Sequence, residues 1–276
     1  MRLKRTACVL MILVSGTFFA VAAEAQTQNP ELLLPEQSAA KAKQLLQQAI
    51  QALGGDAYLN LRDATCTGRA SQFGHSGELT GYEQFFDYTK LPDKERTEYS
   101  SKRNIIEVYN GDQGWVLDRG GVQDAPEEAI NERRENEKKD IDAIFRSRIK
   151  EPGMSFRYAG PDVVDLKEAD WVEMTDGEGR TIRIAFDHAM HLPLRKVIVT
   201  RDPATRLRME EKEYYSNYHP IQGLETPFQV ASDRNGLKTS QVFLKDCQYN
   251  TGLSDSLFTK ESLEERWAKV GKKKKK

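Results

Sequence analysis

The sequence predicts a mainly β (α+β) fold, in which a single curved antiparallel sheet carries an N-terminal helix and a helical insert. Three observations support this prediction. From Asp63 onward, apolar and polar residues alternate with a period of two through most of the chain. Turn residues separate these runs at nearly regular spacing, without the strand–helix alternation of a parallel sheet. Helical spacing is confined to residues 38–53 and 126–149.

Residues 1–25 have the pattern of a secretory signal peptide. Basic residues near the start precede an apolar run over 7–22, which is short for a membrane span. Residues 23–25 (Ala-Glu-Ala) supply the small residues of a cleavage site. We therefore expect secretion to the periplasm and a mature chain that starts at Gln26, with an uncleaved N-terminal anchor as the alternative.

The charge distribution argues against a nucleic-acid partner. The net charge is −1, and Lys272–Lys276 together with the leader hold part of the positive charge, so the body of the protein is acidic. Binding to phosphates requires a basic face on the folded domain. The terminal lysines suit transient contact with anionic head groups, at about 1 kcal/mol per residue near a membrane surface. We expect a monomer.

The mature chain begins with a polar, proline-containing linker at residues 26–37, followed by a helix. Ser38 is the predicted N-cap, and Gly54-Gly55 is predicted to end the helix. One apolar stripe follows helical spacing and is expected to be buried: Ala42, Leu45, Leu46, Ala49, Ile50 and Leu53. The length fits a single domain, predicted over 38–268, with a basic tail at 269–276.

A first block of strands is predicted between residues 64 and 117. Its last two strands flank 110–114 (Asn-Gly-Asp-Gln-Gly), which is typical of a tight hairpin. Both faces of this hairpin carry apolar residues, so we expect it to be covered on both sides in the middle of the sheet. In the second strand, Tyr82, Phe86 and Tyr88 share one face.

A second block of strands is predicted between Phe156 and Tyr249, giving about ten strands in all. In one of them, Ile182, Ile184 and Phe186 lie on the same face. The helical insert at 126–149 between the two blocks is highly charged in its first half. Its second half has an apolar stripe that includes Ile141, Ile144 and Phe145. The insert is either a solvated helix docked at its far end or a movable lid.

The sequence lacks the usual signatures of catalysis. We find neither a nucleophile elbow nor a phosphate-binding glycine loop, so no catalytic residue and no cofactor is expected. His188 and His191 have a spacing seen in metal sites but lie on a predicted turn, and we expect no metal there. Cys66 and Cys247 lie in predicted strands near opposite ends of the domain, either as a disulfide or as two separate buried thiols.

A large sheet with only two predicted helices leaves two interpretations of its apolar faces. Either the helices fill an ordinary core, or part of the sheet remains open to an apolar ligand. Acyl chains suit such a site, because each methylene withdrawn from water contributes ~0.8 kcal/mol. The candidate lining residues are Tyr82, Phe86, Tyr88, Ile106, Trp115, Ile182, Ile184 and Phe186.

The order of elements resembles the LolA/LolB-like superfamily of lipoprotein carriers. Five short motifs carry the resemblance: Gly54-Gly55, Lys90-Leu91-Pro92, Tyr109-Asn110-Gly111 with Gly114-Trp115, Gly223-Leu224-Glu225-Thr226-Pro227, and Leu253 to Phe258. The resemblance implies an incomplete antiparallel barrel capped by helices, with an apolar cavity that takes lipid chains. LolA itself tends to have an arginine at the position of Leu91, which helps to fasten its lid. Leu91 cannot donate those hydrogen bonds, which indicates a divergent member.

Together these features favour a non-enzymatic periplasmic carrier for lipid or lipidated protein. The alternative from another class is an envelope-stress sensor or protein-interaction module on the same scaffold. A hydrolase is the third hypothesis.

Overall fold

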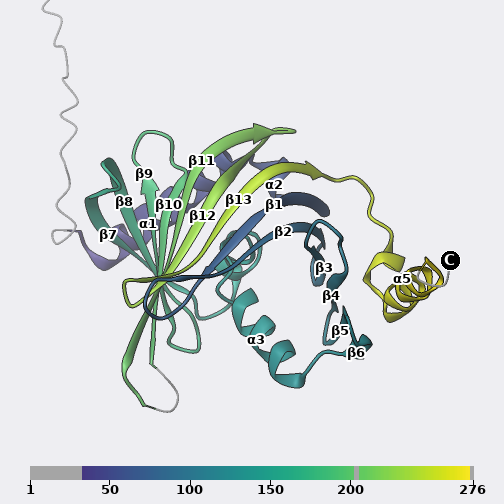
Figure 1. The fold of residues 1–276 in the computed structure, drawn as a ribbon. Coiled ribbons are helices and arrows are strands. Elements are labelled where there is room, and N and C mark those ends of the chain that lie inside the picture. The colour runs from purple at the N-terminus through teal and green to yellow at the C-terminus, as the bar shows by residue number, and fades with distance from the viewer. Residues whose placement is uncertain (1–32, 202–204, 274–276) are drawn as a thin grey trace, which may run out of the picture.

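The computed structural model describes residues 33–201 and 205–273, and only the backbone of residues 270–273. Within these residues the chain forms one antiparallel sheet of thirteen strands, which curls without closing and carries helices on both faces (Figure 1). The predicted mainly β fold is therefore confirmed. The predicted signal peptide at 1–25, most of the linker and the last three lysines lie outside the described residues.

The elements follow the chain in a simple order. They are α1 (Pro35–Leu53), α2 (Asp56–Leu59), β1 (Asp63–Phe73), β2 (Leu79–Lys90), β3 (Lys94–Tyr99), β4 (Ile105–Asn110), β5 (Gln113–Asp118), β6 (Gly121–Asp124), α3 (Glu127–Glu137), α4 (Ile141–Arg146), the 3-10 helix η2 (Arg148–Lys150), β7 (Ser155–Val164), β8 (Lys167–Thr175), β9 (Thr181–Asp187), β10 (Pro193–Arg201), β11 (Arg208–Ile221), β12 (Leu224–Arg234), β13 (Leu237–Tyr249), the 3-10 helix η3 (Asp255–Phe258) and α5 (Lys260–Lys273).

The sheet consists of two meanders joined along one seam. Strands β1 to β6 pair in sequence order, as do β7 to β13, and the two halves meet where β1 pairs antiparallel with β13. Cys66 lies directly opposite Cys247 at this seam, and the two form a disulfide with sulfur atoms 2.08 Å apart. The cysteines are distant in sequence but adjacent in space because the first and last strands are neighbours.

Helix α1 begins before the predicted N-cap. Pro35 occupies its first turn, where a missing N–H costs nothing, so three residues of the predicted linker belong to the helix. Ser38 is buried inside the first turns, and its Oγ accepts a hydrogen bond from the Tyr158 backbone N–H at 2.9 Å. Gly54 ends the helix as predicted, with a positive φ of 129° that favours glycine.

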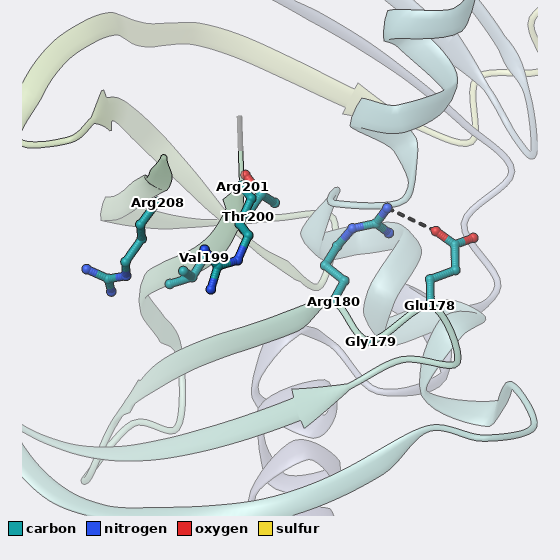
Figure 2. A pocket seen from close by; sticks show the side chains of 7 residues that line it. All are labelled: Glu178, Gly179, Arg180, Val199, Thr200, Arg201 and Arg208. Carbon is teal, nitrogen blue, oxygen red and sulfur yellow. Dashed lines mark hydrogen bonds and ion pairs between the residues drawn. The ribbon is translucent and has the colours of Figure 1, made fainter. Parts of the chain in front are cut away.

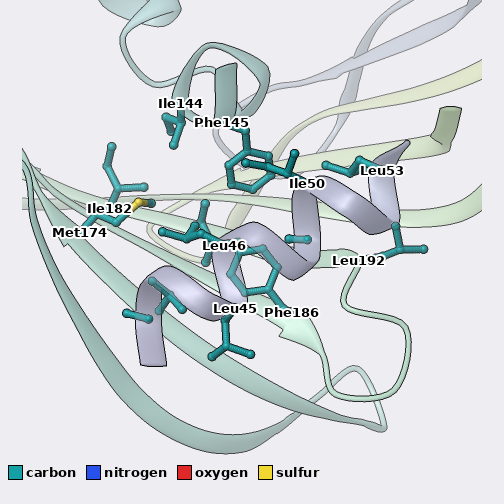
Figure 3. Close-up of a cluster of buried hydrophobic side chains, with 14 of the residues drawn as sticks. Leu45, Leu46, Ile50, Leu53, Ile144, Phe145, Met174, Ile182, Phe186 and Leu192 are labelled. Carbon is teal, nitrogen blue, oxygen red and sulfur yellow. The ribbon is translucent and has the colours of Figure 1, made fainter. Parts of the chain in front are cut away.

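The stripe of α1 packs on the second meander and forms the main core (Figure 3). Ile184 and Phe186 of β9 are fully buried against it, and Ile144 and Phe145 of α4 close the cluster. We call the face of the sheet that carries α1, α3 and α4 the inner face. The opposite face, on which α5 lies, is the outer face (Figure 1).

The β4–β5 hairpin lies near an edge of the sheet, beyond which only β6 follows, so the predicted central position is wrong. Its buried side chains lie on the outer face of the sheet. Ile106 and Val108 pack with Phe258 and Leu263, which come from η3 and α5. Helix α5 is not predicted from the sequence, although Leu263, Trp267 and Val270 follow helical spacing.

The predicted single helix at 126–149 is split in three. The first segment, α3, ends at Glu137, and Asp140 caps α4, where its carboxylate accepts from the Ala143 N–H at 2.9 Å. Helix α3 has no buried residue and lies within the curl of the sheet (Figure 1). Its ion pairs reach both meanders: Arg133 bonds Glu95 of β3, and Lys139, just beyond the helix, bonds Glu211 of β11.

Candidate functional site

A cavity of about 100 Å³ lies between α4 and the inner face of the sheet, beside the C-terminal end of α1. Its walls are mostly aliphatic and aromatic side chains. They are Leu53, Tyr58, Leu61, Ile141, Asp142, Phe145, Arg146, Pro193, Tyr215, Tyr218, Leu224, Glu225, Thr226, Pro227 and Tyr249. We call this space the inner-face cavity.

Four tyrosine rings dominate its walls, and their hydroxyls are paired. Tyr218 donates to the Pro193 carbonyl at 2.7 Å, and Tyr215 donates to the Glu213 carboxylate at 2.5 Å. The Tyr249 hydroxyl lies 2.7 Å from that of Thr226. Burial raises the pKa of each of these tyrosines. The rings therefore stay neutral and present an apolar wall whose polar ends are satisfied.

The fourth tyrosine, Tyr58, ties α2 to α4. Its hydroxyl donates a short hydrogen bond to the Asp142 carboxylate, and burial together with the charge of Asp142 raises the pKa of Tyr58. The guanidinium of Arg146 lies 4.5 Å from the centre of the Tyr58 ring. These contacts place one acid and one base of α4 in the wall of a mostly apolar cavity, to which Glu225 adds a third charge.

The predicted site residues of β9 do not line the cavity. Ile182, Ile184 and Phe186 are at most 1% exposed and are packed by α1 and α4 in the main core. The sheet beneath α1 is therefore filled by the protein's own side chains. For these three residues the structure favours the ordinary-core interpretation.

The other five predicted residues lie on the outer face. Register aligns Tyr88 through β3 and β4 with Trp115, and it aligns Phe86 in the same way with Ile106. Ile106 is buried beneath η3 and α5, whereas Tyr82 is 57% exposed. The eight candidate lining residues therefore lie on two different faces of the sheet. Period-two alternation separates the faces of one strand but does not say which face a distant strand shares.

Two of the three predicted lid residues do line the cavity. Ile141 and Phe145 face it, while Ile144 is fully buried in the main core. The sequence reasoning missed Tyr215 and Tyr218. A spacing of three puts two residues of a regular strand on opposite faces, but Asn217 has a positive φ of 56° that breaks the alternation.

A second hollow of about 510 Å³ lies beside the ends of β9, β10 and β11 (Figure 2). Its arginines do not converge on a common point. Arg180 turns towards Glu178, with which it forms an ion pair of 3.2 Å, and Arg208 pairs with Glu210 at 2.9 Å. Because these cations are already paired, the hollow is a weaker candidate for a binding site.

Over residues 33–201 and 205–273, no three His, Cys, Asp or Glu side chains are grouped to hold a metal ion. None of the helices in those ranges combines the length and apolar character needed to span a bilayer. His188 bonds Asp170 at 2.7 Å through Nδ1.

An open antiparallel sheet that curls around its own helices, with an apolar cavity on the inner face, defines the class of LolA-like folds. No protein-family model matches the sequence, and no curated protein matches it either. Solved structures do match, and they confirm the resemblance to the superfamily at the level of the fold.

Three of these structures each cover about four fifths of the chain. A DUF1329 family protein from Desulfovibrio piger has a TM-score of 0.57 at 17% identity, covering 80% of this chain and 98% of its own. An outer membrane lipoprotein-sorting protein domain from Vibrio parahaemolyticus has a TM-score of 0.54 at 13% identity, covering 81% and 99%. A LolA superfamily protein from Nitrosomonas europaea has a TM-score of 0.51 at 12% identity, covering 80% and 99%. At these identities the likeness concerns the fold.

Proposed function

We propose that this protein is a non-enzymatic periplasmic carrier for lipid or lipidated protein, and that it holds acyl chains in the inner-face cavity. The observation that carries the proposal is the cavity itself, which is walled by aliphatic side chains and neutral tyrosine rings. Such walls favour hydrocarbon, because each methylene that leaves water contributes ~0.8 kcal/mol. The LolA-like fold supports the same reading.

Helix α4 is the proposed cover of the cavity. The space of about 100 Å³ holds only part of a long chain, so loading requires the wall to yield. Helix α4 has six residues, and on its cavity side it is held by Ile141, Phe145 and the Tyr58–Asp142 hydrogen bond. Ile144 and Phe145 also anchor α4 in the main core, but a helix of six residues opens at lower cost than the hydrogen-bonded sheet on the other side.

Variants on opposite faces test the site. Ile141→Asp places a charge on the cavity wall and is expected to weaken binding of a fluorescent C12 fatty acid about tenfold or more. Tyr82→Asp on the exposed outer face is the matched control and is expected to bind as the unchanged protein does. Melting curves of both variants establish that they are folded. If Tyr82→Asp loses binding and Ile141→Asp keeps it, the inner-face cavity is not the site.

A protein-interaction module, such as an envelope-stress sensor, is the second candidate, and one observation favours it. Tyr82 is 57% exposed and Phe243 45% exposed, and both lie on the outer face near the seam of the sheet. Exposed aromatic side chains are common at protein interfaces. Native mass spectrometry after gentle purification separates the two functions, since a carrier retains lipid and a sensor retains a protein.

A further inference from the structure

Arg146 is the one cation in the lining of the inner-face cavity, and one of its hydrogen-bond donors has no acceptor. Its Nε is buried and has no hydrogen-bond partner among the described residues. Its ion pair with Asp142 is long, with Nη2 and Oδ1 3.9 Å apart. A buried donor without a partner costs about 1–3 kcal/mol, so its presence in a cavity wall points to an absent acceptor.

The neighbouring acid does not satisfy this arginine. The Asp142 carboxylate already accepts a hydrogen bond from the Tyr58 hydroxyl, and its side chain is 54% exposed. The guanidinium instead lies against Tyr58, 4.5 Å from the ring centre, and interacts with the Tyr58 hydroxyl, while its Nε stays without an acceptor. Guanidinium bonds to anions are about twice as strong as bonds between neutral groups.

We propose that the ligand of the inner-face cavity is an amphiphile with an anionic head, a carboxylate or a phosphate, which pairs with Arg146 while its acyl chain lies against the tyrosine rings. This inference rests on the proposed function and narrows it, because it selects anionic lipids over neutral ones. The head group sits at the rim, where Arg146 meets solvent, and the chain extends towards Phe145 and Tyr249.

Glu225 carries a charge opposite to that of Arg146, and it therefore provides a second test of the inference. It lines the same cavity and forms no ion pair with any cation in the described ranges. Its negative carboxylate repels the anionic head group of a ligand in the same cavity. Neutralising Glu225 should therefore tighten the binding of an anionic ligand, whereas neutralising Arg146 should weaken it.

Calorimetric titration with matched C12 probes tests the assignment. Dodecanoate and dodecyl phosphate carry the two anionic heads, dodecanol carries a neutral one, and inorganic phosphate lacks the chain. The unchanged protein is expected to bind dodecanoate or dodecyl phosphate at least about tenfold more tightly than dodecanol. Arg146→Gln should remove this preference and leave dodecanol unchanged, and Glu225→Gln should increase it.

Each result decides between the inferences. Equal binding of dodecanoate, dodecyl phosphate and dodecanol overturns the head-group assignment and leaves the carrier function standing. No binding of any C12 probe overturns both. A preference that survives in Arg146→Gln overturns the role of that residue. Inorganic phosphate that binds as tightly as dodecyl phosphate overturns the amphiphile as ligand. If Arg146→Gln does not fold, the preference measured in the unchanged protein still supports or overturns the inference.

Discussion

On the inner face of β2, Asp87 is a carboxylate in an unfavourable place. Removal from water raises its pKa to about 7, and the nearby charge of Glu95 adds to the effect. Thr97 donates a hydrogen bond to it at 2.9 Å, which offsets part of the cost. The residue is therefore a source of pH dependence on the inner face.

Asp87→Asn is expected to stabilise the protein at high pH. The folded pKa of about 7 exceeds the ordinary value of 3.8, so the folded state of the unchanged protein holds a proton that the unfolded state has lost. Its stability falls as pH rises from about 4 to about 7. The variant's advantage should grow across that window to at most about 4 kcal/mol and stay constant above it. Urea unfolding at pH 5, 6, 7 and 8 measures it, and an advantage that shrinks with pH would contradict the assignment.

At the scale of elements, α3 spans the opening of the curled sheet by charge alone. Arg133 reaches Glu95 at 3.2 Å on the first meander, and Glu135 reaches Arg180 at 3.1 Å on the second. In both pairs the arginine is mostly buried and the glutamate is partly exposed, so each pair contributes about 1 kcal/mol and weakens as salt rises. The helix is thus held across the opening by several small, screened contributions and by no apolar packing of its own.

The β1–β13 pair is the element on which the connection between the meanders depends. Cys66 and Cys247 are 181 residues apart in sequence, so their disulfide restricts a very long loop in the unfolded chain. Replacing both by alanine is expected to lower the free energy of unfolding by about 3–5 kcal/mol. Urea unfolding with a fluorescence readout measures the loss. Ala64→Ser on the same strand is a control that keeps the disulfide, and equal stability of all three proteins would contradict the prediction.

At the scale of the whole molecule, the sequence predicted the class of the fold, but it did not predict how the two meanders join or which residues come together in the cavity. Helix α1 and the strand alternation follow local periodicity, so both were predictable. The seam between β1 and β13 was not, because pairing over such a separation leaves no local pattern. The same limit explains the site: Phe145 and Ile141 show helical spacing, whereas Tyr249 joins them only through the curl of the sheet.

The two meanders place their largest cores on opposite faces of one sheet. In β7 to β13 the main core lies on the inner face beneath α1, and a smaller cluster that includes Trp171, Ala185 and Val197 lies on the outer face. In β3 to β6 the core lies on the outer face beneath η3 and α5, while the inner face of the first meander carries Phe85 and Asp87 and faces α3. We infer that the two halves are stabilised by separate clusters that share only the continuity of the strands.

Phe258→Ala tests this separation. The ring is fully buried against Ile106 and Leu263, so its loss leaves a cavity that is expected to cost about 3–5 kcal/mol. If the clusters are separate, hydrogen exchange should accelerate in β4 to β6 and in α5 while α1 and β9 keep their protection. Leu46→Ala in the main core is the matched variant and should show the reverse pattern. Uniform acceleration across the sheet in both variants would instead mean that one cooperative unit includes both faces, and that η3 and α5 stabilise the cavity as directly as α1 does.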